Sequence, residues 1–534
     1  MGGKKQYVLV CLLLLFCLVS LEAYSDQRFI PSDAEVFSRI QQLHRIEGRA
    51  IPPRVGPWTE RELFHAMERL PRLSEGKLFG SIQAGLAYRP LFPFSGQGSA
   101  DISPAYSFEA YLHINEEDFT EEPLWHPRWK DRLPILSIPI SFTVADHFST
   151  HVEFLVVRRL LDYANGTHYV YAPEFSTNHS LRDFFQLDFN WPYSAIAVAG
   201  GNQWNLQIGR ERLNLGPGHT GNLLLSDHLP YHDYMMFKAW LGPIKYSTAL
   251  VGFPSPAETG TGTAKVKALF THRFDWTILP EWHFAITEAM MYQDGVIDFR
   301  FLNPLMIYHQ YFMASVSNSF LTAETWVSIL PGFALYGQIG FDDVRFIDES
   351  DSKPNALGWQ VGMEYGWVVP SGSYLLWAEY VHTDPYLYLR DGIDYVVSFK
   401  AMEPDGGATR YVREYVGYPL GGDATVYAVG LDWDSLENWN GFIRAEYAVD
   451  GAVGFDSPYP PADPQVTTPT GIPETRVRGT VGASFRISAG KFGLERSSLR
   501  VNGSVSYVMI HNLGNTTHDP IHDVQGSLGI AYIL

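Results

Sequence analysis

The stretch Leu357-Gly358-Trp359-Gln360-Val361-Gly362-Met363-Glu364-Tyr365-Gly366-Trp367 decides the fold, because it alternates strictly. Every odd-numbered position carries a large apolar side chain, and every even-numbered position carries Gly, Gln or Glu. A period of two is that of a β-strand, whose successive side chains point to opposite faces. One face of this strand suits lipid and the other suits a polar lumen, which is the pattern of a transmembrane β-barrel.

The same alternation recurs in segments of about ten residues from residue 105 to the C-terminus. Clear examples are Val477 to Ile487, Ile443 to Val449 and Val524 to Leu534. A soluble β-sandwich also alternates, but it does not need apolar faces on so many successive strands. We therefore predict an all-β transmembrane barrel of about 18 antiparallel strands, with about 16 or about 20 as the alternatives. The predicted strands begin near residues 105, 136, 150, 183, 203, 235, 244, 263, 282, 322, 333, 357, 373, 424, 440, 476, 498 and 523.

The connections between these strands mostly alternate between long and short. Gly242-Pro243 and Pro370-Ser371-Gly372 are typical short ones. In outer-membrane barrels the short turns are periplasmic and the long loops are extracellular. Residues 101–534 are therefore predicted to form one outer-membrane barrel whose two ends lie on the periplasmic side. The long connections fall near 114–135, 158–182, 210–234, 293–321, 342–356, 383–423 and 450–475.

The composition agrees with a barrel and excludes other classes of protein. The chain has 534 residues, of which 18% are charged and 14% are aromatic, with a net charge of -19. Few charges suit lipid-facing strands, and aromatic side chains collect at membrane interfaces. So many aromatic residues exclude a disordered chain, and the acidic excess argues against a nucleic-acid partner. The expected partners are outer-membrane lipid and the machinery that assembles outer-membrane barrels.

The first 25 residues are predicted to be a secretory signal peptide. Lys4-Lys5 precedes the apolar run Tyr7 to Val19, and small residues follow between Ser20 and Ser25. This order matches the basic, apolar and cleavage regions of such a peptide. The alternative is an uncleaved N-terminal anchor. Both of the 2 cysteines lie in this segment, so we expect neither a disulfide nor a thiolate metal site in the mature chain.

Residues 26–100 are predicted to form a periplasmic helical cap and a connecting segment. Ser32 with Glu35, and Thr59 with Glu62, have the spacing of a capping box. Apolar residues follow each of them at helical spacing, which predicts two amphipathic helices. So short a segment is expected to pack against the barrel rather than fold by itself.

Two segments fall outside the regular pattern. Ile82 to Tyr88 looks like a short strand that belongs with the cap. Phe301 to Met313 is far more apolar than a solvated loop would be. It is predicted to fold inward, or across the mouth, as a helical plug, or else to extend a strand above the membrane. We favour the plug and therefore expect an occluded lumen, since a barrel of this size otherwise holds an aqueous channel.

Several charged residues lie on the predicted lumen-facing side of the strands. Paired carboxylates could cleave a glycoside, but an ion-pair lattice that braces the interior accounts for these residues without catalysis. The sequence has no Ser-His-Asp elbow and no His-Glu-x-x-His motif. We therefore predict no enzyme, no metal site and no cofactor. The lattice residues are Glu364, Glu379, Arg444, Glu446, Arg478 and Arg486.

The stretch Ile208-Gly209-Arg210-Glu211-Arg212-Leu213-Asn214-Leu215-Gly216-Pro217-Gly218-His219-Thr220-Gly221-Asn222-Leu223-Leu224-Leu225-Ser226-Asp227 resembles the Wzi family of outer-membrane capsule assembly proteins. The shared features are a Gly-Arg segment, then Gly-Pro-Gly, then a Gly-x-Leu-Leu-Leu-Ser-like run. The N-terminal helices and the Phe301-x-Asn303-Pro304 region also look like that family. The resemblance implies a barrel of about 18 strands with an occluded lumen. It also implies a lectin that holds surface or capsular polysaccharide without catalysis.

Within this motif we expect a polysaccharide site at the extracellular rim. Gly-Pro-Gly forces a tight turn at which the backbone can closely approach another surface. The arginines could donate paired hydrogen bonds to uronate carboxylates. Equally, they could brace the lumen while the glycines only shape the loop. A substrate-specific porin or transporter is the alternative function, followed by a surface enzyme or adhesin. The candidate residues are Arg210, Arg212, Gly216, Pro217, Gly218, Ser226 and Asp227.

Overall fold

A computed structural model describes most of the chain after residue 26. The described residues are 27–534 without 71–75, 88–90, 95–97, 121–123, 129–130, 159–161, 165–166, 170–174, 180–186, 255–264, 304–305, 309–315, 344–353, 391–392, 402–409, 460, 464 and 489–496. The predicted signal peptide lies outside them. No helix in the described part is long and apolar enough to cross a membrane.

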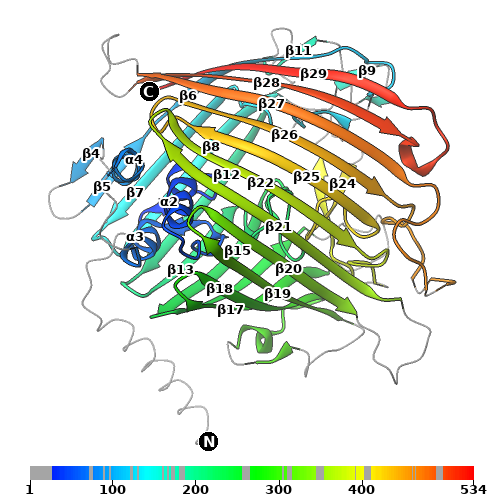
Figure 1. Ribbon diagram of the computed structural model, residues 1–534, viewed down its shortest axis with the longest axis horizontal. Coiled ribbons are helices and arrows are strands. Elements are labelled where there is room, and N and C mark those ends of the chain that lie inside the picture. The colour runs from blue at the N-terminus through cyan, green and yellow to red at the C-terminus, as the bar shows by residue number, and fades with distance from the viewer. Residues whose placement is uncertain are drawn as a thin grey trace, which may run out of the picture.

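Eighteen antiparallel strands of the described chain form a closed β-barrel, which confirms the predicted fold (Figure 1). The last strand pairs with the first from Ile533 beside Ala105 to Gln525 beside His113, and this ladder closes the sheet. The strands are β6 (Ala105–His113), β7 (Leu136–Val144), β8 (Phe148–Arg158), β12 (Leu187–Gly200), β13 (Trp204–Glu211), β15 (His232–Leu241), β16 (Ile244–Phe253), β17 (Val266–Leu279), β18 (Trp282–Asp294), β19 (Ser317–Leu330), β20 (Phe333–Asp343), β21 (Ala356–Val369), β22 (Gly372–Thr383), β25 (Ala424–Asp434), β26 (Trp439–Asp450), β27 (Glu474–Ser488), β28 (Ser498–His511) and β29 (Ile521–Ile533).

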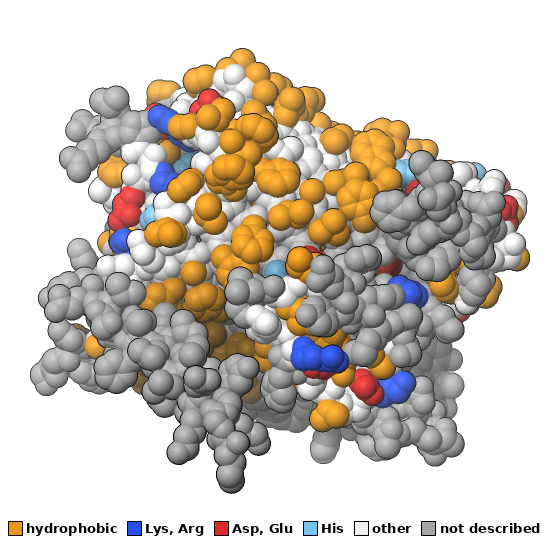
Figure 2. All heavy atoms as spheres, turned by 90° about the horizontal axis from the view of Figure 1, so that it is seen from below, with side chains coloured by type: hydrophobic (Ala, Val, Ile, Leu, Met, Phe, Trp, Pro, Cys, Tyr) orange, Lys and Arg blue, Asp and Glu red, His pale blue; other side chains and the backbone are white. Residues whose placement is uncertain are grey.

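The alternation read from the sequence separates the two faces of the wall. On β21, Val361, Met363 and Tyr365 are exposed, whereas Gln360 and Glu364 on the other face are buried. Figure 2 shows hydrophobic side chains gathered over much of the wall that is visible from below. An apolar outer face of this kind is what the hydrocarbon region of a membrane requires.

The barrel wall begins slightly before the predicted boundary at residue 101. Strand β5 (Gly98–Ile102) pairs with β7, and β4 (Phe92–Phe94) pairs with β5. The register of β5 on β7 continues into β6 after Pro104, where Ala105 lies opposite Ser137. The other half of β6 pairs instead with the short strand β11 (Phe175–Thr177). The last residues of the predicted connecting segment therefore belong to the sheet.

Two helices of the cap follow the prediction, although the start of the first one differs. Helix α3 (Glu60–Glu68) has the predicted capping box, in which Thr59 and Glu62 satisfy each other's backbone N–H groups. Helix α2 (Glu35–Ile46) begins after Ala34 without a side-chain cap, so the predicted box at Ser32 is wrong. The hydroxyl of Ser32 donates instead to the carbonyl of Arg212, 3.4 Å away in a distant part of the chain.

The segment that was predicted as a cap strand is helical. Helix α4 (Lys77–Leu86) includes most of it, and Leu78, Ile82 and Leu86 are buried. These side chains recur every four residues, which is the spacing of one helix face. They pack with the buried face of α2 in one apolar cluster. Burial of these side chains between the two helices therefore determines the structure of this segment, and the strand predicted from its alternating pattern is wrong.

The cap docks inside the end of the barrel at which the short turns lie, where Figure 1 places α2 and α3 within the ring of strands. The Arg45 guanidinium donates to Glu364 of β21 at 2.5 and 3.0 Å, and both side chains are buried. The Gln42 amide donates to the carbonyl of Tyr374 at 2.9 Å, and Arg39 pairs with Asp434 at 2.7 Å. The cap is therefore bonded to the wall rather than standing beside it.

The largest apolar core among the described residues also lies inside the barrel. Two connections supply it, with Leu223, Leu224 and Leu225 from one and Tyr388 from the other. The Tyr388 hydroxyl donates to the carbonyl of Leu223 at 2.6 Å. Wall residues such as Leu269 complete the cluster. The part of the lumen that these two connections enter is therefore packed like the interior of a soluble domain.

The apolar segment 301–313 follows neither predicted course in its described part. Phe301 and Tyr308 pack against Phe270 of β17. Phe270 shares its strand face with Trp276, which is 49% exposed on the lipid side. Residues 304–305 and 309–315 lie outside the described chain. The described part of the segment therefore lies against the outer wall rather than in the lumen, because an apolar strand face offers it a partner there.

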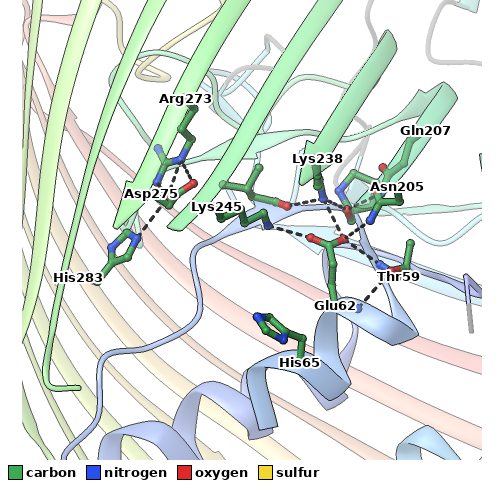
Figure 3. Close-up of polar contacts among 12 residues, drawn as sticks. Thr59, Glu62, His65, Asn205, Gln207, Lys238, Lys245, Arg273, Asp275 and His283 are labelled. Atoms are coloured by element: carbon green, nitrogen blue, oxygen red, sulfur yellow. Dashed lines mark hydrogen bonds and ion pairs between the residues drawn. The ribbon is translucent and has the colours of Figure 1, made fainter. Parts of the chain in front are cut away.

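A buried ion cluster joins α3 to the wall, and Figure 3 shows Glu62 between two lysines. The Lys238 ammonium is buried and donates to Glu62 at 3.3 Å and to the carbonyls of Val55 and Pro57. Lys245 donates to the other oxygen of Glu62 at 2.8 Å. Burial favours the neutral acid, but the two lysines hold the pKa of Glu62 below its usual value.

We expect Glu62→Gln to destabilise the protein by about 3 kcal/mol, because it leaves the buried Lys238 charge without a counter-ion. Thermal unfolding in detergent, followed by tryptophan fluorescence, measures the change. The double variant with Lys238→Met should recover most of the loss. Glu68→Gln is the control, since its carboxylate is half exposed. Equal losses for Glu62→Gln and Glu68→Gln would contradict this account.

Candidate ligand site in the barrel lumen

The connection 212–231, which follows β13, folds into the lumen of the barrel. Its short strand β14 (Asn214–Leu215) pairs with β2 (Val55–Gly56) from the cap. A segment from the long-loop end and a segment of the cap therefore meet inside the barrel. The Gly-Pro-Gly turn lies at this junction and not at the extracellular rim, so the predicted rim position is wrong. The reason is a set of long-range contacts from the cap and the wall.

The glycines of this turn have a steric role. Gly216 has φ +143°, and a Cβ atom there would overlap the side chain of Asn222. A Cβ atom on Gly218 would overlap the carbonyl oxygen of Gly221. Arg54 of the cap donates to the carbonyls of Pro217 and Gly218 at 2.9 and 3.2 Å. The exposed backbone that we expected to approach a ligand is therefore bound by the protein's own arginine.

Two buried carboxylates from the wall hold the next residues of the loop. Glu379 accepts hydrogen bonds from the backbone N–H groups of His219 and Thr220 at 2.8 and 2.9 Å. Glu364 contacts His219 Nε2 at 2.7 Å, and the imidazole stacks on Trp377 with centroids 4.4 Å apart. Burial, followed by the charge of Arg54, lowers the pKa of His219. A neutral imidazole then donates its Nε2–H to Glu364.

Arg210 and Arg212 occupy different environments. Arg210 lies on the outer face of β13, the face on which Ile208 is exposed. Its guanidinium donates twice to Asp233, at 2.7 and 2.8 Å, and lies 4.0 Å from the centre of the Tyr231 ring. Both paired donors of Arg210 are therefore occupied by a neighbouring strand.

Arg212 follows the end of β13, and its guanidinium has only long contacts with the described residues. Its guanidinium lies 3.5 Å from the hydroxyl of Tyr193, 3.5 Å from the carbonyl of Pro230 and 3.9 Å from Asp131. About a third of its side chain is exposed, since the exposed fraction is 32%. Strong guanidinium hydrogen bonds to carboxylates measure about 2.7 to 2.9 Å. Arg212 therefore keeps donors for an external carboxylate.

A polar cavity of about 300 Å³ lies where the loop faces the cap. Gly218, Ser226 and Asp227 of the predicted site line it, together with Asp33 and Arg54. Burial raises the pKa of the Asp227 carboxyl, and the nearby arginines oppose that shift. Three of the seven predicted residues thus line one cavity. The two arginines of the motif do not line it.

The remaining residues of the predicted lattice form a separate group on the inner wall. Arg444 pairs with Asp432 at 3.2 Å, and Arg478 pairs with Glu446 at 2.8 Å. Arg486 is exposed and forms no ion pair with the described residues. Glu364 and Glu379 contact the loop and the cap instead. The predicted lattice residues therefore lie in two groups, because Glu364 and Glu379 contact the inserted loop rather than the arginines of the wall.

Three residues that hold the loop were missed from the sequence. Arg45, Arg54 and His219 contact Glu364 from positions 319, 310 and 145 residues away. No local pattern predicts contacts over such separations. Only the adjacent Gly-Pro-Gly turn marked His219 as part of an unusual loop.

Comparisons with known proteins find a likeness in structure only. No protein-family model and no curated protein matches the chain. The structure resembles that of Wzi, an outer-membrane protein involved in group 1 capsule assembly in Escherichia coli and a carbohydrate-binding β-barrel. The TM-score is 0.56 at 13% identity, and the match covers 94% of this chain and 99% of that one. OprD from Pseudomonas aeruginosa and a BenF-like porin from Pseudomonas fluorescens give TM-scores of 0.38 and 0.39 at 8% identity; these matches cover 82% of this chain and 95% and 98% of theirs. At 13% identity the match to Wzi supports the barrel fold alone.

We expect the wild-type protein to show no ohmic conductance of the order of a nanosiemens in planar bilayers, because loop and cap meet in the lumen. Replacing residues 216–226 by a short Gly-Ser linker should open the pore to that conductance. Shortening the connection at residues 456–463 is the control and should leave the pore closed. A wild-type channel that conducts at this level would contradict the packing described above.

We also expect the stability of the protein to fall in acid through His126. Its Nδ1 lies 3.3 Å from Arg478, and burial, with Arg478 and Arg444, lowers the pKa of His126 from 6.5 to about 3. The unfolded chain takes up this proton below pH 6.5 and the folded one does not. Stability should therefore drop between pH 6.5 and 3, by about 3 kcal/mol at pH 4.

Thermal unfolding midpoints at pH 7 and pH 4 measure this loss. His126→Gln should flatten the pH dependence, whereas the exposed-loop control His518→Gln should keep it. An unchanged slope in His126→Gln would refute the assignment.

Proposed function

We propose that the protein binds an acidic surface polysaccharide at the outer membrane and holds it without chemical change. The observation that carries this proposal is the guanidinium of Arg212, which is partly exposed and has no contact shorter than 3.5 Å with the described oxygen atoms around it. A uronate carboxylate can accept two parallel hydrogen bonds from such a group. On a chain with a net charge of -19, a local cation of this kind is needed to attract an acidic glycan.

The surroundings of Arg212 suit a sugar. The hydroxyl of Tyr193 lies beside the guanidinium. Asp227 is close enough to Arg212 to influence it electrostatically and lines the polar cavity with Ser226. Hydroxyl and carboxylate groups can exchange hydrogen bonds with sugar hydroxyls. The whole-length likeness to Wzi supports the same class of ligand, since that protein is a carbohydrate-binding barrel involved in capsule assembly.

The contacts of the lumen carboxylates support a binding role rather than glycoside cleavage. Glu379 accepts four hydrogen bonds, from the backbone N–H groups of His219 and Thr220 and from the hydroxyls of Thr220 and Tyr336. Glu364 accepts hydrogen bonds from Arg45 and contacts His219. A catalytic pair must reach the two sides of a glycosidic bond, whereas these oxygens are already bonded to the protein.

A substrate-specific porin or transporter is the second candidate function. It is favoured by the arginines of the inner wall, of which Arg444 and Arg486 are exposed. A row of exposed cations can select anions in a pore. An anion-selective conductance in the wild-type protein would favour this function over polysaccharide binding.

Binding of the purified protein to immobilised polysaccharides tests the first proposal. We expect binding to uronate-containing chains and weaker binding to neutral chains of similar length. Arg212→Ala should weaken the binding ten- to a hundredfold, about 1.5 to 3 kcal/mol for a charged hydrogen bond. Arg210→Ala is the matched control, because its guanidinium is already paired with Asp233. Absence of binding to every acidic polysaccharide, or equal losses in the two variants, would overturn the proposal.

A further inference from the structure

A second and larger cavity lies at the periplasmic end of the barrel. Its volume is about 570 Å³, and it separates α3 from the turns that join β15 to β16 and β17 to β18. This volume falls in the range of small-molecule sites, about 300 to 1,000 Å³. Most of the lining is apolar and comes from Phe37, Ile51, Trp58, Leu63, Trp240 and Leu279.

The acidic groups at this cavity are already neutralised by the protein. Glu62 is bonded to Lys238 and Lys245, as Figure 3 shows. Asp275 is bonded to Arg273 at 2.7 Å and lies 3.2 Å from His283. Glu68 at the mouth pairs with Arg61 at 3.1 Å. A ligand in this cavity would therefore not meet an unopposed negative charge.

The polar groups that remain without acidic partners are donors. Arg69, which lines the cavity, contacts the hydroxyl of Thr277 and His65 Nε2, each at 3.2 Å, and a backbone carbonyl. Arg49, also in the lining, has no side-chain hydrogen bond or ion pair with any described residue. Trp240 is 97% buried, and its indole N–H finds no acceptor in the described chain. Buried donors normally have hydrogen-bond partners. The unpaired N–H of Trp240 therefore suggests that a bound molecule supplies the acceptor.

We propose that this cavity binds a small amphipathic carboxylate from the periplasmic side. The apolar body would lie between the tryptophans and leucines of the lining. The carboxylate would bond to the guanidinium groups of Arg69 and Arg49, and the N–H of Trp240 would meet an acceptor atom of the same molecule. An apolar pocket with a few fixed polar groups is the usual form of such a site. The inference does not rest on the polysaccharide proposal, because its charged donors are Arg69 and Arg49 rather than Arg212, although Phe37 and Trp58 line both cavities.

Such a ligand would bridge the cap and the wall. Its binding surface includes Leu63 and Ala66 of α3 together with Trp240 and Leu279 of the barrel. A ligand that binds only the docked arrangement stabilises it by mass action. Occupancy should therefore raise the midpoint of thermal unfolding.

Three naphthalene probes with the same body test the proposal on the full-length mature protein in amphipol, where no detergent micelles compete for the probe. The probes are 2-naphthoate, 2-naphthol and (2-naphthyl)trimethylammonium, and the readouts are calorimetric Kd and the unfolding midpoint. We expect 2-naphthoate to bind at least tenfold more tightly than 2-naphthol, to raise the midpoint, and to bind much more tightly than the cation. Equal affinities for the three probes, or no binding of any, would overturn the proposal.

Two variants locate the site. Arg69→Gln at the mouth should weaken 2-naphthoate at least tenfold and leave 2-naphthol nearly unchanged. Ala66→Phe should fill the cavity and abolish binding of both probes. Arg300→Gln is the matched control, since that arginine lies on the outer wall and pairs with Asp298. Unchanged 2-naphthoate binding in Arg69→Gln would refute the carboxylate contact even if Ala66→Phe failed to fold.

Discussion

The pairing of β29 with β6 is the constraint on which the rest of this structure depends. In a hydrocarbon environment each backbone N–H and C=O must find its partner within the protein, and an open sheet edge would leave a whole row of them unpaired. Closure at Ile533 and Ala105 removes that edge. It also fixes which residues face lipid, because the strand period of two leaves no freedom once the register is set. Because the closed sheet has 18 strands, it encloses a lumen, which is either open to water or filled by other parts of the chain.

The lumen is filled from both ends, and the wall carboxylates stabilise the meeting point. The cap brings Arg45 and Arg54 from the end with the short turns, and the 212–231 connection brings His219 from the end with the long loops. All three contact Glu364. Removing one partner from such a buried cluster leaves a charge that nothing else compensates. The position of the loop in the lumen and the docking of the cap therefore depend on one electrostatic arrangement.

The period of two in the sequence was enough to predict the strands and the closed barrel, but not the contacts inside it. The alternation along Leu357 to Trp367 requires a strand with one lipid face, and repeated segments of that kind require closure. The alternation predicted a strand at α4, where burial against α2 produces a helix instead. The apolar segment at Phe301 was predicted to fill the lumen, but Phe301 packs on the outer wall. Contacts such as that of Arg54 with Pro217 join residues 163 apart. No pattern within a strand encodes them.

The two arginines of the loop motif show how a strand end changes the meaning of a period. Arg210 and Arg212 are two residues apart, so an unbroken strand would place both on one face. Strand β13 ends at Glu211, and Arg212 leaves the alternation. Arg210 then pairs with the next strand through Asp233, whereas Arg212 turns to Tyr193 and Asp131 at distances too long for strong bonds. The proposed contact with a ligand of opposite charge therefore falls on Arg212, because this residue lies beyond the end of the strand and keeps donors that Arg210 has already used.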